Sequence, residues 1–76
     1  MTTLTIYSTP VCQQCKATYR FLDTRNIDYT IVDVTENPSA REYITEELGY
    51  SQAPVVVADD HDHWSGFRPD QLMRFA

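Results

Sequence analysis

The chain has 76 residues, of which 42% are hydrophobic and 12% aromatic, so it can form a single domain spanning residues 1–76 with one compact core. Six basic residues are scattered among eleven acidic ones (net charge −5), which argues against the basic patch that nucleic-acid binding requires. No apolar run approaches the roughly 20 residues of a membrane span and no leader-like segment opens the chain, so we expect a cytoplasmic monomer without a membrane partner.

The first half of the chain predicts two strands joined by a helix. Residues 3–7, TLTIY, form a short β-rich run, and residues 29–34, YTIVDV, form a second one. Between them a helix starts at Gln13 or Gln14 and ends at Asn26, which can adopt the left-handed conformation that ends helices. The apolar residues Cys15, Tyr19 and Leu22 recur at helical spacing and form one face of this helix, and Ala17 and Phe21 lie beside that face.

The second half predicts a helix, a strand hairpin and a last short helix. Asn37 and Pro38 are typical of a helix start, and Gly49 of a helix end. Residues 54–58, PVVVA, form a strand, followed by a polar turn and a return strand that begins at the sequence HW. Gly66 ends that strand, and Pro69 starts the final helix.

The resulting element order is β-α-β-α-β-β-α. A β-α-β unit crosses over right-handed and places its two strands parallel, whereas the closing β-β pair forms an antiparallel hairpin. We therefore predict an α/β fold with a four-stranded mixed sheet flanked by three helices. This is the element order of the minimal thioredoxin fold, for which we expect the strand order 2-1-3-4.

The only two cysteines, Cys12 and Cys15, stand in the stretch TPVCQQCKAT, where the first strand has ended and the first helix begins. A cysteine attacks as its thiolate, and a thiol with a pKa near 8.5 is only about 3% ionised at pH 7. The unpaired N–H groups at a helix start favour the thiolate by up to about 2 kcal/mol. Cys15 follows nearly one turn later and further from solvent. We expect Cys12 to be the nucleophile of a thiol–disulfide oxidoreductase and Cys15 to be the resolving cysteine.

Two other uses of a cysteine pair are a structural disulfide and a metal site. A disulfide that closes so short a loop contributes little stability. A zinc site would need His61 and His63, which follow the cysteines by far more than the usual dozen or so residues and stand in ADDHDHW, a predicted solvated hairpin tip. A module that binds a metal or cluster through its cysteines stays open as a rival. We expect no metal and no bound cofactor, with the reversible Cys12–Cys15 disulfide as the redox centre.

Pro54 opens a strand that the element order places inside the sheet, and proline is tolerated there only at the first residue. A trans proline that merely begins the strand is one possibility. With two cysteines upstream in this element order, we expect a cis Ala53–Pro54 bond. The backbone of Ala53 is then open to pair with an extended substrate peptide beside Cys12, so we assign Ala53 and Pro54 to substrate binding.

Three features together resemble the NrdH-redoxins, a glutaredoxin-like branch of the thioredoxin superfamily. They are the CxxC motif at Cys12 and Cys15 after a strand ending in tyrosine, the proline that opens PVVV, and the stretch WSGFRPD at residues 64–70. The resemblance covers essentially the whole chain. It implies a dithiol electron carrier that thioredoxin reductase recharges from NADPH and that reduces a disulfide of class Ib ribonucleotide reductase.

Two interpretations of WSGFRPD stay open. Trp64 and Phe67 either cap the small core or contact a partner beside the reactive site, as aromatic residues often do. We assign Trp64, Gly66 and Phe67 to substrate binding, and we expect Arg68 to brace the loop through hydrogen bonds to backbone.

A glutathione-dependent glutaredoxin is the nearest rival function. Ordinary glutaredoxins carry a Gly-Gly turn and a following acid that holds the α-amino end of glutathione, and Pro-Tyr between their cysteines. This chain has Ser65-Gly66, an inserted Arg68-Pro69 before Asp70, and two glutamines between its cysteines. These departures favour thioredoxin reductase over glutathione as the electron source.

Overall fold

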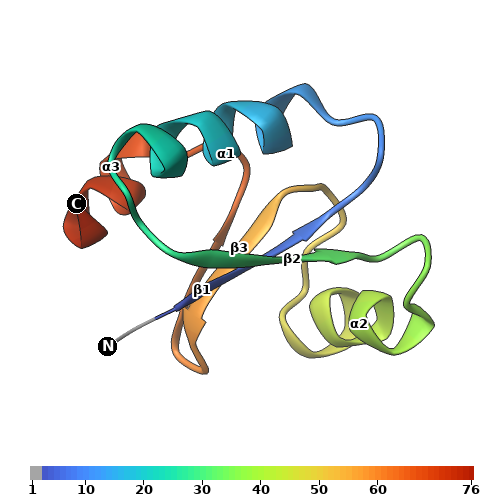
Figure 1. Cartoon of the computed structure of the whole chain (residues 1–76). Helices are drawn as coiled ribbons and strands as arrows, with labels where there is room; N and C mark the ends of the chain where they lie inside the picture. Colours follow the sequence, from blue (N-terminus) through green and yellow to red (C-terminus); the bar gives the residue numbers. More distant parts are fainter. Residues whose placement is uncertain (1–2) are drawn as a thin grey trace.

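A computed structural model describes residues 3–76 and contains one four-stranded sheet with helices on both faces (Figure 1). The strand order is β2-β1-β3-β4, as predicted. β1 and β2 run parallel, and β1–β3 and β3–β4 run antiparallel. The strands are β1 (Leu4–Ser8), β2 (Tyr29–Asp33), β3 (Val55–Asp59) and β4 (Asp62–Ser65).

Three helices cover the sheet. They are α1 (Gln13–Thr24), α2 (Pro38–Glu42) and α3 (Pro69–Leu72), and a 3₁₀ turn over Met73–Phe75 follows the last. α1 and α3 lie on one face of the sheet and α2 on the other (Figure 1). Among residues 3–76, no helix combines the length and the apolar character needed to cross a membrane.

The helix-capping predictions are confirmed. Asn26 has a φ of 56°, and Gly49 a φ of 78°, so both lie in the left-handed region that ends helices. The Asn37 side chain accepts a hydrogen bond from the backbone N–H of Ala40 at 3.1 Å, and Pro38 occupies the first turn of α2.

Other element boundaries differ from the prediction. α2 does not continue as one regular helix to Gly49, because Tyr43–Glu47 forms a π-helical segment closed by the hydrogen bond from Leu48 N–H to the Tyr43 carbonyl. The return strand already starts at Asp62, since Asp62 pairs with Asp59 across the hairpin. The predicted polar turn is therefore two residues long.

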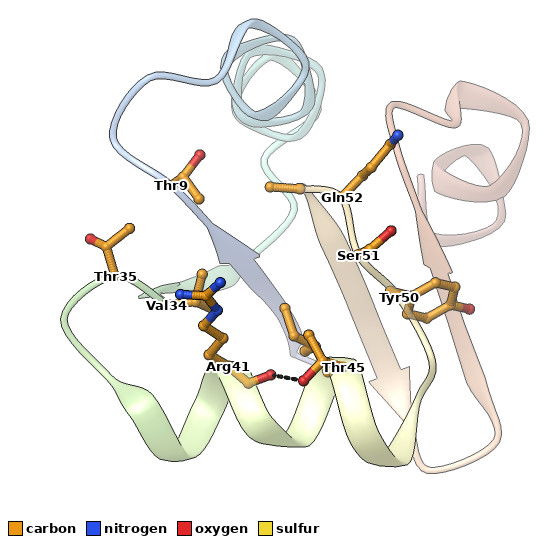
Figure 2. A pocket seen from close by; sticks show the side chains of 10 residues that line it. Thr9, Val34, Thr35, Arg41, Thr45, Tyr50, Ser51 and Gln52 are labelled. Carbon is orange, nitrogen blue, oxygen red and sulfur yellow. Dashed lines mark hydrogen bonds between the residues drawn. The ribbon is translucent and has the colours of Figure 1, made fainter.

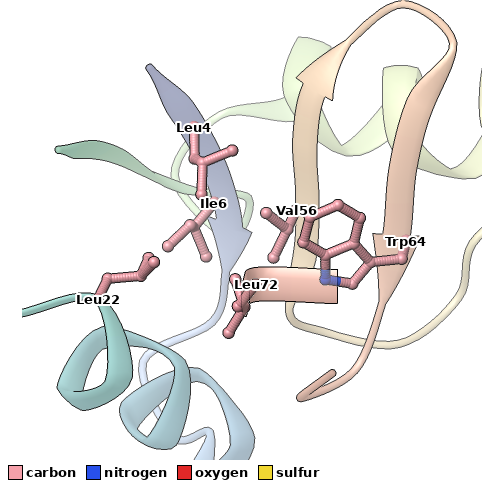
Figure 3. Close-up of a cluster of buried hydrophobic side chains, with 6 residues drawn as sticks. All are labelled: Leu4, Ile6, Leu22, Val56, Trp64 and Leu72. Atoms are coloured by element: carbon pink, nitrogen blue, oxygen red, sulfur yellow. The ribbon is translucent and has the colours of Figure 1, made fainter. Parts of the chain in front are cut away.

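The main core lies between the sheet and the pair α1 and α3 (Figure 3). Its buried members are Leu4, Ile6, Leu22, Val56, Trp64 and Leu72. On α1 the fully buried residue beside Cys15 and Leu22 is Thr18, not Tyr19 as predicted. Thr18 is accommodated because its hydroxyl donates to the Gln14 carbonyl at 2.8 Å, whereas Tyr19 stacks on Tyr29 at the rim of the core.

A smaller cluster packs under α2 on the opposite face of the sheet. Val34, Ile44 and Val55 are its buried members. The Tyr7 and Tyr43 rings lie 5.8 Å apart beside them, and burial raises the pKa of the Tyr7 hydroxyl. This cluster fixes α2 beside the carboxyl end of β1, next to which the cysteines lie.

Candidate redox-active site

Cys12 and Cys15 lie at the junction between β1 and α1. Cys12 is the N-cap of α1, with extended backbone angles, and Cys15 lies in the first turn. The two residues form a disulfide bond, with their Cα atoms 5.2 Å apart. Cys12 is partly exposed, whereas only 1% of Cys15 is accessible, so just one of the two sulfurs can meet a large partner.

The backbone around Cys12 suits a negatively charged sulfur. The N–H of Cys15 points at the Cys12 Sγ atom at 3.0 Å. That N–H belongs to the start of α1, where backbone donors lack helical partners and the helix dipole is positive. After reduction of the disulfide, this N–H can donate a hydrogen bond to a thiolate on Cys12, and such a bond stabilises the charged form.

A hollow of about 360 Å³ surrounds the Cys12 sulfur. Its lining residues come from the loop after β1, the first turn of α1 and the loop before β3: Thr9, Val11, Cys12, Gln13, Gln14, Gln52 and Ala53. The Ala53–Pro54 bond is cis. Pro54 is fully buried, and its carbonyl accepts a hydrogen bond from Gly66 N–H at 2.8 Å. The structure thus brings the cysteines, Ala53 and Pro54 to one edge of the sheet.

A second hollow of similar size continues from the first toward α2 (Figure 2). The two share Thr9, Gln52 and Ala53. Further lining residues come from the turn after β2, from α2 and the π-helical segment that follows it, and from the loop before β3: Val34, Thr35, Arg41, Ile44, Thr45, Tyr50 and Ser51. The two hollows therefore adjoin each other at these three shared residues.

His63 does not lie in a solvated hairpin tip, contrary to the prediction. It lies in β4 and is half-buried, and its Nδ1 atom is 2.9 Å from the Tyr50 hydroxyl. The two rings also pack edge to face at 5.5 Å. The Ser65 hydroxyl donates to the Gln52 carbonyl at 3.0 Å, so β4 holds the loop before Pro54 at two places. Only His61 remains at the exposed tip.

The aromatic residues of WSGFRPD have different environments. Trp64 is 5% exposed, inside the main core, and its buried Nε1 atom has no hydrogen-bond partner within the described part of the chain, residues 3–76. Little of this ring is accessible to a partner, which favours the core interpretation of Trp64. Phe67 is half-exposed and packs edge to face on Phe21, with ring centroids 6.3 Å apart.

Arg68 braces its loop through a carboxylate and not through backbone, contrary to the prediction. Its Nε and Nη2 atoms donate to the two carboxylate oxygens of Asp70 at 3.1 and 2.8 Å. The side-chain hydrogen bonds from Arg68 hold the pKa of the Asp70 carboxyl below its usual range. The two residues flank Pro69 at the start of α3, where Arg68 is the N-cap and Asp70 lies in the first turn.

Gln14 is a site residue that sequence reasoning missed. Its side-chain Oε1 atom accepts a hydrogen bond from the Phe67 N–H at 3.0 Å, so a residue between the two cysteines anchors the WSGFRPD loop. Gly66 suits this contact, because it has a φ of 87° and a Cβ there would lie 3.2 Å from Oε1 of Gln14. Nothing in the spacing of the motif reveals a bond between residues so far apart in sequence.

Replacing Gln14 by alanine is expected to loosen this loop without unfolding the protein. A net hydrogen bond contributes about 1 kcal/mol, so amide exchange at Phe67 should accelerate by roughly fivefold. Hydrogen exchange followed by NMR measures this effect. Gln13→Ala is the matched control, because the structure gives Gln13 no hydrogen bond to that loop. Equal exchange at Phe67 in the two variants would contradict the anchoring role.

Residues 3–76 contain no group of three or more histidine, cysteine, aspartate or glutamate side chains arranged to hold a metal ion. The site offers two sulfurs that are joined as a disulfide and, on reduction, become a dithiol. Its chemistry is therefore thiol–disulfide exchange, with the Cys12–Cys15 pair as the redox centre.

Comparison with known proteins agrees with this chemistry. The glutaredoxin family model matches residues 4–64. The glutaredoxin-like protein NrdH of Escherichia coli K12 is 42% identical over 71 residues, which cover 93% of this chain and 85% of that protein. The gene 56 protein of Mycobacterium phage D29 is 37% identical, over 93% of this chain and 79% of its own.

Solved structures show the same relationship. NrdH-redoxin from Escherichia coli, described as a glutaredoxin-like protein with a thioredoxin-like activity profile, superposes with a TM-score of 0.88 at 41% identity. The match covers 96% of this chain and 93% of that one. A glutaredoxin from Archaeoglobus fulgidus has a TM-score of 0.79 at 25% identity, over 99% of this chain and 86% of its own. This chain belongs to the glutaredoxin family, in its NrdH-redoxin branch, and is a thiol oxidoreductase.

Proposed function

We propose that the protein is a dithiol electron carrier in which Cys12 is the nucleophile and Cys15 the resolving cysteine. The observation that carries this assignment is the contrast between a partly exposed Cys12, with a backbone N–H aimed at its sulfur, and a Cys15 that is 1% exposed. An exposed thiolate can reach a disulfide on another protein, and a buried thiol one turn away can reach only Cys12.

The proposed reaction balances two electrons and two protons. The Cys12 thiolate attacks one sulfur of the client disulfide, the client's S–S bond breaks, and the departing sulfur takes up a proton. Cys15 then loses its proton and attacks Cys12 Sγ, which forms the Cys12–Cys15 disulfide and releases the second client thiolate to be protonated. The client is reduced to a dithiol and the carrier is oxidised.

We infer that thioredoxin reductase returns the electrons from NADPH and that a disulfide of class Ib ribonucleotide reductase receives them. The support is the similarity to proteins named NrdH, one of which is described as having a thioredoxin-like activity profile. In this role the protein acts as a monomer in the cytoplasm.

The substrate contacts proposed for this reaction lie on the loops around Cys12. Ala53 lines the hollow, Pro54 follows it through the cis bond, and Gly66 is held to Pro54 by a backbone hydrogen bond. Phe67 contributes the exposed aromatic edge beside Gln14. Arg68 acts on client binding indirectly, by holding this loop through Asp70.

The internal contacts of the loop argue against glutathione as the electron source. Glutathione presents an α-amino acid end that needs a carboxylate for its ammonium group and N–H donors for its carboxylate. Asp70 is already paired with Arg68, and the N–H of Phe67 with Gln14. A glutathione molecule would have to displace both contacts before it gained its own.

A coupled assay tests the electron source. NADPH oxidation should require the protein, thioredoxin reductase and a disulfide substrate together, and should stay at background when glutathione and glutathione reductase replace thioredoxin reductase. The reverse pattern would establish the glutathione-dependent alternative. Metal analysis of the freshly purified protein addresses the remaining rival, since a stoichiometric metal that is lost on mutation of either cysteine would indicate a metal- or cluster-binding module.

A further inference from the structure

Val11 is unusually exposed for an apolar residue. Its exposed fraction is 94%, compared with 54% for Met73 and 49% for Ile31, the other exposed large hydrophobic residues among residues 3–76. A single exposed apolar side chain needs no explanation on most surfaces. Val11, however, directly precedes Cys12 and lines the same hollow as the Cys12 sulfur. Its position therefore puts it in contact with whatever reacts there.

The hollow around Cys12 contains no charged side chain. Its lining residues carry only methyl groups, hydroxyls, amides and one sulfur: Thr9, Val11, Cys12, Gln13, Gln14, Gln52 and Ala53. In the whole chain 22% of residues are charged and the net charge is −5. The lining next to Cys12 is thus uncharged in an acidic protein, whereas Arg41 lines the adjoining hollow.

The proposed reaction, reduction of a client disulfide by Cys12, indicates what occupies this hollow. The inference therefore rests on the proposed function. A client disulfide has to bring one sulfur to Cys12 Sγ. The residue beside the attacked cysteine, whose Cα atom is about 3.8 Å from that of the cysteine, therefore comes close to the site of reaction. On this protein, the residue that directly precedes Cys12 and lines the same hollow is Val11. We propose that Val11 is a specificity-determining residue, which selects clients that carry an uncharged, apolar residue next to the attacked cysteine.

The selection has a favourable and an unfavourable part. An apolar client residue that packs on the Val11 methyl groups removes apolar surface from water on both partners. A charged client residue at the same place would lose hydration without gaining an ion pair, because the lining offers none. Discrimination is therefore expected against aspartate and lysine alike.

Three synthetic peptides test the proposal. Each has one intramolecular disulfide, and they differ only in having leucine, serine or aspartate next to the attacked cysteine. Protein that has been reduced and freed of reductant is mixed with excess peptide, and acid quenching, alkylation and mass spectrometry give the single-turnover rate. Titration with the small disulfide dithiodipyridine counts the reactive thiols in every preparation.

The wild-type protein should react about tenfold faster with the leucine peptide than with the serine peptide in the second-order rate constant of this single turnover, and should react with the aspartate peptide more slowly still. Val11→Thr keeps the shape of the side chain and replaces one methyl group by a hydroxyl, so the leucine preference should fall to about threefold. Val11→Leu should keep the full preference. Ile31→Thr is the matched control on the edge strand β2 and should behave as the wild type.

The possible failures are distinguishable. If the wild type reduces all three peptides at the same rate, or if Val11→Thr and Ile31→Thr have equal preferences, the specificity role of Val11 is wrong while the proposed function stands. If dithiodipyridine reacts but no peptide disulfide is reduced, the proposed protein-disulfide reduction itself fails, and the role of Val11 fails with it.

Discussion

Cys15→Ser should accumulate a covalent complex with the client, joined through Cys12, and should lose multiple-turnover disulfide reduction. The first attack needs only the exposed Cys12 thiolate, which keeps its hydrogen bond from the residue 15 N–H because that donor belongs to the backbone. The second attack needs a thiol in the buried position, which serine cannot supply. Non-reducing electrophoresis and mass spectrometry measure the trapped complex.

Cys12→Ser is the matched control for this experiment. The thiol that it leaves behind is Cys15, of which 1% is accessible, so trapping should be reduced by at least a factor of about 100, the usual scale for losing a positioned reacting group. Equal trapping by the two variants would reverse the assignment of nucleophile and resolving cysteine. If both variants are folded and neither forms a covalent complex, the proposal that Cys12 attacks protein disulfides is wrong.

Leu22→Ala should destabilise the protein by about 2–5 kcal/mol, the range found for leucine truncation in a packed core. Leu22 is fully buried in the main core, where it joins α1 to the sheet. A domain of this size has a free energy of unfolding of only about 4–11 kcal/mol, so this loss removes much of its stability. Chemical denaturation of the oxidised protein gives the free energy directly.

Met73→Ala provides the comparison for Leu22→Ala, since Met73 is 54% exposed and lies outside both core clusters. The Met73→Ala substitution should lower the free energy of unfolding by no more than about 0.5 kcal/mol. A Leu22→Ala variant as stable as Met73→Ala would mean that α1 is not held by this core, and the placement of Cys12 at the end of a fixed helix would lose its basis.

The architecture was predictable because its signals are local and redundant. The β-branched runs, the Asn37-Pro38 helix start and the left-handed residues Asn26 and Gly49 each indicate one boundary without reference to the rest of the chain. The order of the elements then leaves few ways to build one sheet. The cysteine pair was predictable for the same reason, since both residues lie in one turn of one helix.

The contacts that hold the surrounding loops could not be predicted from local patterns. Gln14 and Phe67 are 53 positions apart and meet only because α1 and α3 pack on the same face of the sheet. The contact of Tyr50 with His63 likewise joins a loop to β4 through the fold. The burial of Thr18 in place of Tyr19 was not predicted, because periodicity assigns buried helix positions to apolar residues. The Thr18 hydroxyl donates a hydrogen bond within its own helix, which lets a polar residue occupy the position.

The burial of Cys15 beside Cys12 also bears on oxidative damage. Hydrogen peroxide that reaches the exposed sulfur converts its thiolate to a sulfenic acid, which is lost irreversibly only if a second oxidant follows. Here the neighbouring thiol is shielded from the oxidant and lies within bonding reach, so it condenses with the sulfenic acid and releases water. The product is the same Cys12–Cys15 disulfide that the proposed reaction produces, so reduction of that disulfide would also restore the protein after peroxide exposure.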